Sequence, residues 1–139
     1  MLQAHESKEE EIYQALEPYI ATWFRNKYHH FTPPQRYAIV EIINRRNILI
    51  CAPTGSGKTF ASFLGIINHL CKLNRRDKLE DRVYCLYISP LKALGNDIRR
   101  NLEEPLAEIA AIMEHEAGIT KKISAVSYTH LTLPTNREV

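Results

Sequence analysis

The amino-acid sequence predicts an α/β protein in which an incomplete parallel sheet is flanked by helices and preceded by an N-terminal helical segment. Three short stretches rich in apolar, β-branched and aromatic residues, 47–52, 83–89 and 123–126, have the composition of strands covered on both faces. Two longer stretches with apolar residues at helical spacing, 58–73 and 91–113, separate them. Strands that alternate with helices along a chain favour parallel pairing.

Residues 1–30 predict the N-terminal helical segment. Apolar residues recur there every three to four positions, with acidic side chains early and basic side chains late, an order that suits a helix dipole. Pro18 interrupts the pattern, so we expect a kink or two shorter helices. Thr32 then stands where a helix cap is expected, before a further helix over 35–44.

The composition is typical of a soluble globular protein, since 45% of the residues are hydrophobic and 24% are charged. No apolar run is long enough to cross a membrane, and the acidic N-terminus does not resemble a secretory signal. We therefore expect a cytoplasmic protein without a membrane partner. Cys51, Cys71 and Cys85 are isolated and lack zinc-site spacing, which predicts reduced, buried thiols.

Residues 52–59, Ala-Pro-Thr-Gly-Ser-Gly-Lys-Thr, have the pattern of a phosphate-binding P-loop between a predicted strand and a predicted helix. Gly55 and Gly57 allow the backbone to turn so that successive N–H groups face phosphate oxygens. Lys58 can reach the β- and γ-phosphates, and the Thr59 hydroxyl can ligate Mg²⁺. The sequence therefore predicts a site for a nucleoside triphosphate with Mg²⁺. The alternative is a chance loop that opens a helix.

Gln35 lies upstream of the loop, after the sequence Phe-Thr-Pro-Pro. A glutamine amide offers a donor and an acceptor, which match N6 and N7 of adenine. We interpret Gln35 as the residue that recognises the base and the nucleotide as ATP; the alternative is an early helix residue on a polar face. The residues predicted to bind ATP are Gln35, Pro53, Thr54, Gly55, Ser56, Gly57, Lys58 and Thr59, of which Lys58 and Thr59 are also predicted to be catalytic.

This combination of motifs resembles the Lhr-like (large helicase-related) ATP-dependent helicases of superfamily 2, chiefly the archaeal type. The resemblance is carried by residues 31–35, 47–64, 84–97 and 99–109. Ala52, in place of the first glycine of the P-loop, is typical of that superfamily. The resemblance implies the ATP-binding portion of a DNA or RNA helicase, in which the first RecA-like domain acts together with a second RecA-like domain.

Pro90, Leu91 and Lys92 directly follow the second predicted strand. They resemble the family's motif Ia, which holds the phosphate backbone of a bound nucleic-acid strand. Ligands of parallel α/β folds bind at the carboxyl ends of the strands, and Lys92 with the N-terminal amides of the next helix could hold phosphates. The alternative is an ordinary strand-to-helix turn with proline at the first helical position.

The resemblance divides the chain into a helical segment at 1–30, a partial RecA-like ATP-binding domain at 31–126 and a non-family tail at 127–139. The tail resembles translated adaptor sequences that recur on unrelated sequences, so we interpret it as an artefact at the end of a truncated helicase domain. The family's Asp-Glu-x-His box has no counterpart, because the nearest imitation, 112–115, follows no predicted strand. We therefore expect the isolated chain to lack ATPase activity.

Two other classes of function stay open at the level of sequence. One is a non-helicase P-loop enzyme such as a small kinase, although no acceptor site or lid is found in the sequence. The other is a non-catalytic P-loop fragment that acts only as a nucleotide-binding or interaction module.

Overall fold

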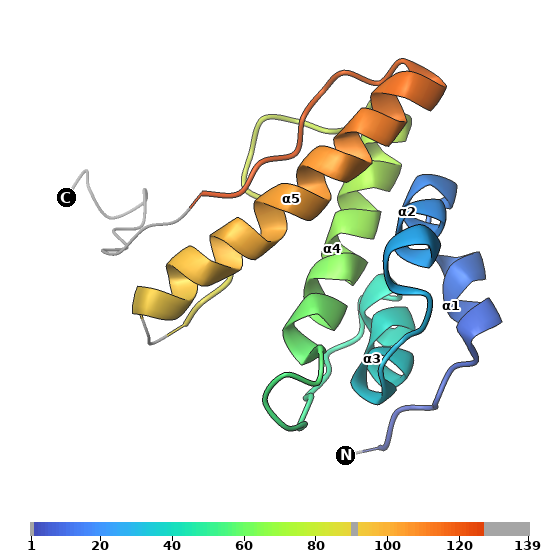
Figure 1. Ribbon diagram of the computed structural model, residues 1–139, viewed down its shortest axis with the longest axis vertical. Coiled ribbons are helices and arrows are strands. Elements are labelled where there is room, and N and C mark those ends of the chain that lie inside the picture. Colours follow the sequence, from blue (N-terminus) through green and yellow to red (C-terminus); the bar gives the residue numbers. More distant parts are fainter. Residues whose placement is uncertain (1, 90–91, 127–139) are drawn as a thin grey trace.

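A computed structural model describes residues 2–89 and 92–126 of the chain (Figure 1). All the regular secondary structure in these two ranges is helical. In Figure 1, α5 crosses α4 at an angle, and the smaller helices α1, α2 and α3 lie beside α4; α2 also packs directly against α5. None of the helices in these two ranges is long and apolar enough to cross a membrane. The helices are α1 (Glu9–Ala15), α2 (Pro18–Tyr28), α3 (Pro33–Ile43), α4 (Lys58–Arg75) and α5 (Lys92–Ala117).

The predicted parallel sheet is wrong, because the described part of the chain is all-helical and contains no strand. The stretches 47–52, 83–89 and 123–126 have no regular secondary structure. Their apolar side chains are in part exposed, Leu49 to 69% and Ile88 to 77%. Apolar and β-branched composition predicts burial, whereas a strand also needs a neighbouring backbone for its N–H and C=O groups. The α/β class is therefore replaced by an all-helical arrangement for the described residues.

Local sequence signals set the helix ends. Pro18 is the first residue of α2, so the N-terminal segment forms two helices, as the sequence predicts. Thr32 precedes α3 as its N-cap, and Gly118, with a φ of 65°, follows the last residue of α5. Pro105 does not end α5, which continues through it over 26 residues. A proline removes one backbone hydrogen bond inside a helix, so α5 is weakest at this turn.

The core joins the N-terminal helices to α4. The buried ring of Phe24 stacks on Phe31, with 4.2 Å between ring centroids, and lies 6.2 Å from the ring of Phe60 on α4. Gly65 allows α3 and α4 to approach closely, since a Cβ at Gly65 would lie 2.5 Å from Cγ2 of Ile42. The starts of α3 and α4 are therefore fixed relative to each other by one continuous apolar core.

The cysteines differ in their surroundings. Cys71 is buried, and burial raises the pKa of its thiol to about 12, which keeps it protonated and unreactive. Cys51 and Cys85 are exposed, so the predicted burial of all three thiols is wrong for these two. Both lie in stretches that were expected to be strands. Within the described ranges, no group of three or more His, Cys, Asp or Glu side chains could hold a metal ion.

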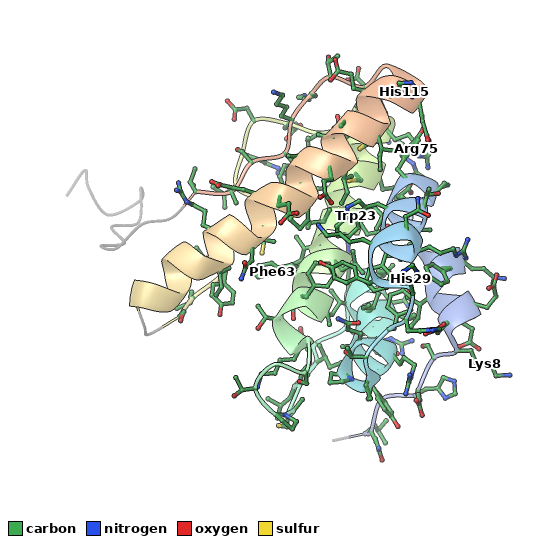
Figure 2. All side chains as sticks on the ribbon, in the orientation of Figure 1. Lys8, Trp23, His29, Phe63, Arg75 and His115 are labelled. Atoms are coloured by element: carbon green, nitrogen blue, oxygen red, sulfur yellow. The ribbon has the colours of Figure 1, made fainter. Side chains whose placement is uncertain are left out.

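A polar network joins α2 to α5, and Figure 2 shows its member Trp23 on α2. The Nε1–H group of Trp23 donates to Oε2 of Glu108 at 2.5 Å. The ammonium of Lys27 forms ion pairs with Glu104 at 3.1 Å and Glu108 at 3.0 Å. The hydrogen bond from Trp23, followed by that from Lys27, lowers the pKa of Glu108 below the usual carboxyl value. The network therefore prefers the ionised form of Glu108.

A Glu108→Gln variant of the chain should melt at a lower temperature than the parent at neutral pH, and at the same temperature in acid. Because folding lowers the Glu108 pKa, the stabilising contribution of the carboxylate is present above its ordinary pKa of about 4.3. That contribution is lost as the pH falls through the lowered pKa. Thermal melts of both proteins between about pH 3 and pH 7 measure the difference.

Glu104→Gln is the matched control for this prediction, because the side chain of Glu104 is 71% exposed and bonds Lys27 without contacting Trp23. Its effect should be smaller than that of Glu108→Gln, since exposed ion pairs contribute little. A melting-temperature difference for Glu108→Gln that is independent of pH would contradict the charge interaction.

Candidate nucleotide-binding site

The loop from Pro53 to Gly57 leads directly into α4, whose first residue is Lys58. Gly55 and Gly57 have φ values of 80° and 83°, a region that residues with side chains rarely adopt. The N–H of Ser56 donates to the Pro53 carbonyl at 3.3 Å, which closes a tight turn. The first N–H groups of α4 have no partner within the helix and carry the positive end of its dipole. This is the backbone geometry of an anion-binding helix start.

Three side chains add hydrogen-bonding groups at the loop. The ammonium of Lys58 donates to the Ala52 carbonyl at 2.7 Å and so lies across the loop. Thr59 is exposed in the first turn of α4. The Ser56 hydroxyl is buried and has no hydrogen-bond partner among the described residues. A cation and two hydroxyls beside free backbone N–H groups fit the oxygens of a triphosphate.

Gln35 contacts this loop. Its side chain is buried at 5% exposure; Oε1 accepts a hydrogen bond from the Thr32 N–H at 2.9 Å, and Nε2 donates to the Gly57 carbonyl at 3.4 Å. The structure therefore places Gln35 against the loop and engages both ends of its amide with the protein backbone, while recognition of adenine by Gln35 stays a prediction. A Cβ placed on Gly57 would lie 2.6 Å from Nε2 of Gln35, so the contact also excludes a larger residue there.

The contact between Gln35 and Gly57 is one that sequence reasoning missed. A signal for it was present, because Thr32 followed by Gln35 three residues later is the pattern of a helix capping box. In that arrangement the glutamine side chain turns back toward the N-cap backbone. A residue fixed at the start of α3 can then reach the loop, provided that α3 and α4 pack closely.

A groove of about 410 Å³ opens beside the loop. It has a polar end on the first turns of α4 and an apolar part formed by α3, α4 and the stretches 47–52 and 83–89. The polar lining residues are Lys58, Thr59 and Ser62, and the apolar ones are Ile42, Ile48, Ile50, Ile66 and Tyr87. The groove therefore shares two residues with the predicted phosphate site and is continuous with it.

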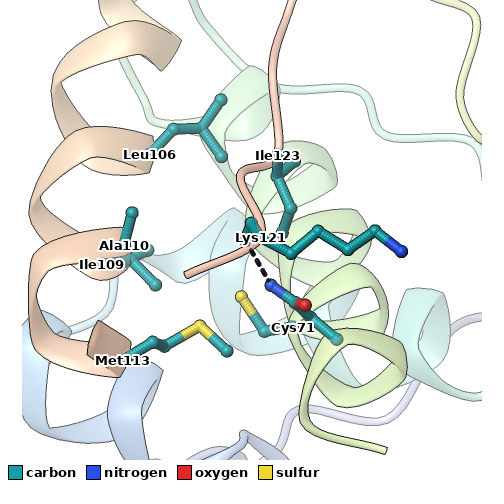
Figure 3. Close-up of a pocket in the computed structure, with 8 residues that line it drawn as sticks. Cys71, Leu106, Ile109, Ala110, Met113, Lys121 and Ile123 are labelled. Carbon is teal, nitrogen blue, oxygen red and sulfur yellow. Dashed lines mark hydrogen bonds between the residues drawn. The ribbon is translucent and has the colours of Figure 1, made fainter. Parts of the chain in front are cut away.

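A smaller cavity of about 10 Å³ lies between α4, α5 and the residues that follow α5 (Figure 3). This volume is about that of one water position. Asn74 donates to the Lys121 carbonyl at 2.8 Å in its wall, and the other lining side chains are mainly apolar. The cavity is a gap in the packing of α4 and α5, and its chemistry does not suit a nucleotide.

The predicted nucleic-acid contacts lie at the start of α5. Lys92 is the first residue of this helix, within one residue of the predicted start. Pro90 and Leu91 lie outside the described residues. Contact of all three with nucleic acid stays a prediction.

Comparison with known proteins identifies the family. The sequence model of the DEAD/DEAH box helicase family matches residues 32–136, and the chain belongs to this family. The helices α1 and α2 precede the matched region. The predicted domain boundaries, including the end of family sequence at Val126, stay predictions.

Within this family the chain is similar to archaeal helicases named ATP-dependent helicase Lhr-Core, which confirms the predicted resemblance. It is 59% identical over 114 residues to the Methanocaldococcus jannaschii protein, an alignment that covers 82% of this chain and 13% of that protein. It is 57% identical over 104 residues to the Saccharolobus solfataricus protein, covering 75% of this chain and 12% of that protein. The chain thus spans about one eighth of the length of these relatives.

A bacterial relative is also similar. The Lhr helicase/probable uracil glycosylase of Mycolicibacterium smegmatis is 44% identical over 92 residues, which cover 66% of this chain and 6% of that protein. No solved structure matches the chain.

Gly57→Ala should weaken nucleotide binding and lower the melting temperature more than Gly55→Ala does. Both substitutions place a side chain at positive φ, which costs about 1–2 kcal/mol. The new Cβ at Gly57 would also meet Gln35, whereas nothing lies within 4 Å of a Cβ at Gly55. Titration with a fluorescent ATP analogue and thermal melting measure the two effects. Equal losses in both variants would mean that Gln35 does not constrain the loop.

Proposed function

We propose that this segment is the ATP-binding part of an ATP-dependent DNA or RNA helicase, and that residues 53–59 hold the triphosphate. The observation that carries the proposal is the left-handed loop that opens α4 beside Lys58 in a chain of the DEAD/DEAH box helicase family. Its archaeal relatives are named as ATP-dependent helicases, which supports the same assignment.

The roles of the individual residues follow from their chemistry. The N–H groups of Gly55, Gly57, Lys58 and Thr59 and the Ser56 hydroxyl, which has no partner among the described residues, would donate to phosphate oxygens, while Pro53 and Thr54 shape the entry to the loop. Lys58 exchanges the Ala52 carbonyl for the β- and γ-phosphates. Bound Mg²⁺ would neutralise phosphate charge during phosphoryl transfer, and the exposed Thr59 hydroxyl is the residue of this loop that could hold it.

The proposed helicase uses more of the polypeptide than this segment. A carboxylate that orients the attacking water is required for hydrolysis, and none is assigned among the described residues. We infer that a longer protein carrying this segment supplies such a group and a second motor domain, as the greater length of the relatives suggests. We also infer that the segment alone hydrolyses no ATP. The nucleic-acid strand would contact residues 90–92 through its phosphates. A cytoplasmic location fits substrates of this kind, and cell fractionation tests it.

A non-catalytic nucleotide-binding or interaction module is the second candidate function. It is favoured by the lack of an assigned carboxylate that could orient the attacking water among the described residues. The two candidates differ in one measurement. Hydrolysis of ATP that is stimulated by single-stranded nucleic acid, in the longer protein that carries this segment, supports the helicase; nucleotide binding without any hydrolysis supports the module.

Lys58→Ala should weaken ATP binding by about 100-fold in that longer protein, because charge-assisted hydrogen bonds contribute about 1.5–3 kcal/mol each. Lys72→Ala is the matched control, since Lys72 lies on the same helix, exposed, near its other end. Isothermal titration with ATP and Mg²⁺ measures both. Unchanged affinity in Lys58→Ala would overturn the assignment of the loop.

Gln35→Ala should weaken ATP binding more than GTP binding. The amide still has one hydrogen on Nε2 and one lone pair on Oε1 after its bonds to Gly57 and Thr32, and these match adenine N7 and N6. Competition of ATP and GTP for a fluorescent nucleotide measures the preference. If both affinities fall by the same factor, the glutamine acts only through the Gly57 carbonyl and does not recognise the base.

A further inference from the structure

Trp23 touches the first turn of α4 and the middle of α5 at the same time. Its ring centroid lies 6.1 Å from that of Phe60, which follows Lys58 by two residues on α4. The other edge of the indole donates its Nε1–H to Glu108 of α5 at 2.5 Å. The ring is 4% exposed, so a shift of either helix must move it or break one of these contacts.

Lys27 adds a second contact at the same place. Its ammonium bonds Glu104 and Glu108 at 3.1 and 3.0 Å, and these two carboxylates stand on either side of Pro105. Because Pro105 lacks an N–H, α5 has one backbone hydrogen bond fewer at this turn and bends there most easily. The bond that Pro105 cannot make is the one to the carbonyl of residue 101, so Lys27 holds α5 at the C-terminal side of this weak turn. The contacts with α2 thus set the direction in which the N-terminal half of α5 points.

The N-terminal half of α5 ends at the predicted nucleic-acid contacts. From Pro105 to Lys92 the helix extends about 20 Å at a rise of 1.5 Å per residue. A small change of angle at Pro105 therefore becomes a displacement of several ångströms at Lys92. The first turn of α4, which holds Lys58, and the start of α5 are in this way connected through side chains of α2.

We propose that Trp23, Lys27 and Glu108 are positioning residues that couple the P-loop to the nucleic-acid contacts at the start of α5. This inference rests on the proposed helicase function. Nucleotide bound at the loop shifts Phe60 with the first turn of α4, the Trp23 ring transmits the shift to Glu108, and α5 turns about Pro105. The affinity for nucleic acid then depends on bound nucleotide, and the dependence is reciprocal.

The test uses the longer helicase that carries this segment. The dissociation constant for a fluorescein-labelled single-stranded oligonucleotide is measured with and without a non-hydrolysable ATP analogue, and the ratio of the two constants is the coupling. Trp23→Phe keeps a ring against Phe60 and removes the N–H donor. Its coupling should be smaller than that of the parent by about threefold or more, while its affinity for the analogue in the absence of oligonucleotide stays within about twofold.

Lys27→Met provides a second variant that does not alter the core, since the Lys27 side chain is 28% exposed. It should reduce the coupling in the same direction even if Trp23→Phe folds poorly. Arg75→Met is the matched control: Arg75 forms an ion pair with Glu17 at 2.8 Å, which joins α2 to α4 without touching α5. It should lower the melting temperature and leave the coupling at the parental value.

The outcomes separate the inference from the function on which it rests. Parental coupling in both Trp23→Phe and Lys27→Met would overturn the inference and leave the helicase assignment standing. A parent protein whose oligonucleotide affinity does not depend on nucleotide would overturn both. Lys92→Ala should weaken oligonucleotide binding even without nucleotide, whereas Trp23→Phe and Lys27→Met should change mainly the dependence of that binding on nucleotide. This difference distinguishes a direct contact from a positioning role.

Discussion

The ring of Phe24 is the contact on which the arrangement of the site depends. It stacks on Phe31, which immediately precedes the cap of α3, and it approaches Phe60 in the first turn of α4. The two helices that carry Gln35 and Lys58 therefore both start beside one buried side chain. Burial of a phenylalanine is worth about 3–5 kcal/mol by truncation, a large part of the roughly 5–15 kcal/mol that stabilises a domain.

The features that the sequence predicts correctly are those encoded by neighbouring residues. The start of α4 at Lys58, the cap at Thr32 and the break at Pro18 each follow from a few adjacent side chains with fixed backbone preferences. The turn at Gly55 and Gly57 belongs to the same group, since its glycines and the helix that follows are contiguous. Such signals act within one or two turns and need no knowledge of the tertiary structure.

The features that could not be predicted need partners distant in the chain. The hydrogen bond from Trp23 to Glu108 joins residues 85 positions apart, and no periodicity pairs them. The prediction of a sheet fails for the same reason, because the composition of a stretch does not determine which other backbone segment lies beside it to form hydrogen bonds. Even so, residues 48–50 keep the alternation of an extended chain: Ile48 and Ile50 pack against the core, and Leu49 is exposed. Side-chain direction is thus local information, whereas pairing is not.

The bond between Lys58 and the Ala52 carbonyl explains how the loop can be ordered and still be able to bind the proposed phosphate. An ammonium that bonds a neutral carbonyl at 2.7 Å stabilises the turn without a counter-anion. A phosphate oxygen is a stronger acceptor for the same group, because it carries negative charge and forms an ion pair with the ammonium, whereas the carbonyl is neutral. Exchange of acceptors therefore favours the phosphate, and the Ala52 carbonyl that it releases lies in a half-exposed position where water can satisfy it. In the proposed function, the lysine would therefore hold the loop in its left-handed conformation before nucleotide binds and lose little stability when it leaves the carbonyl.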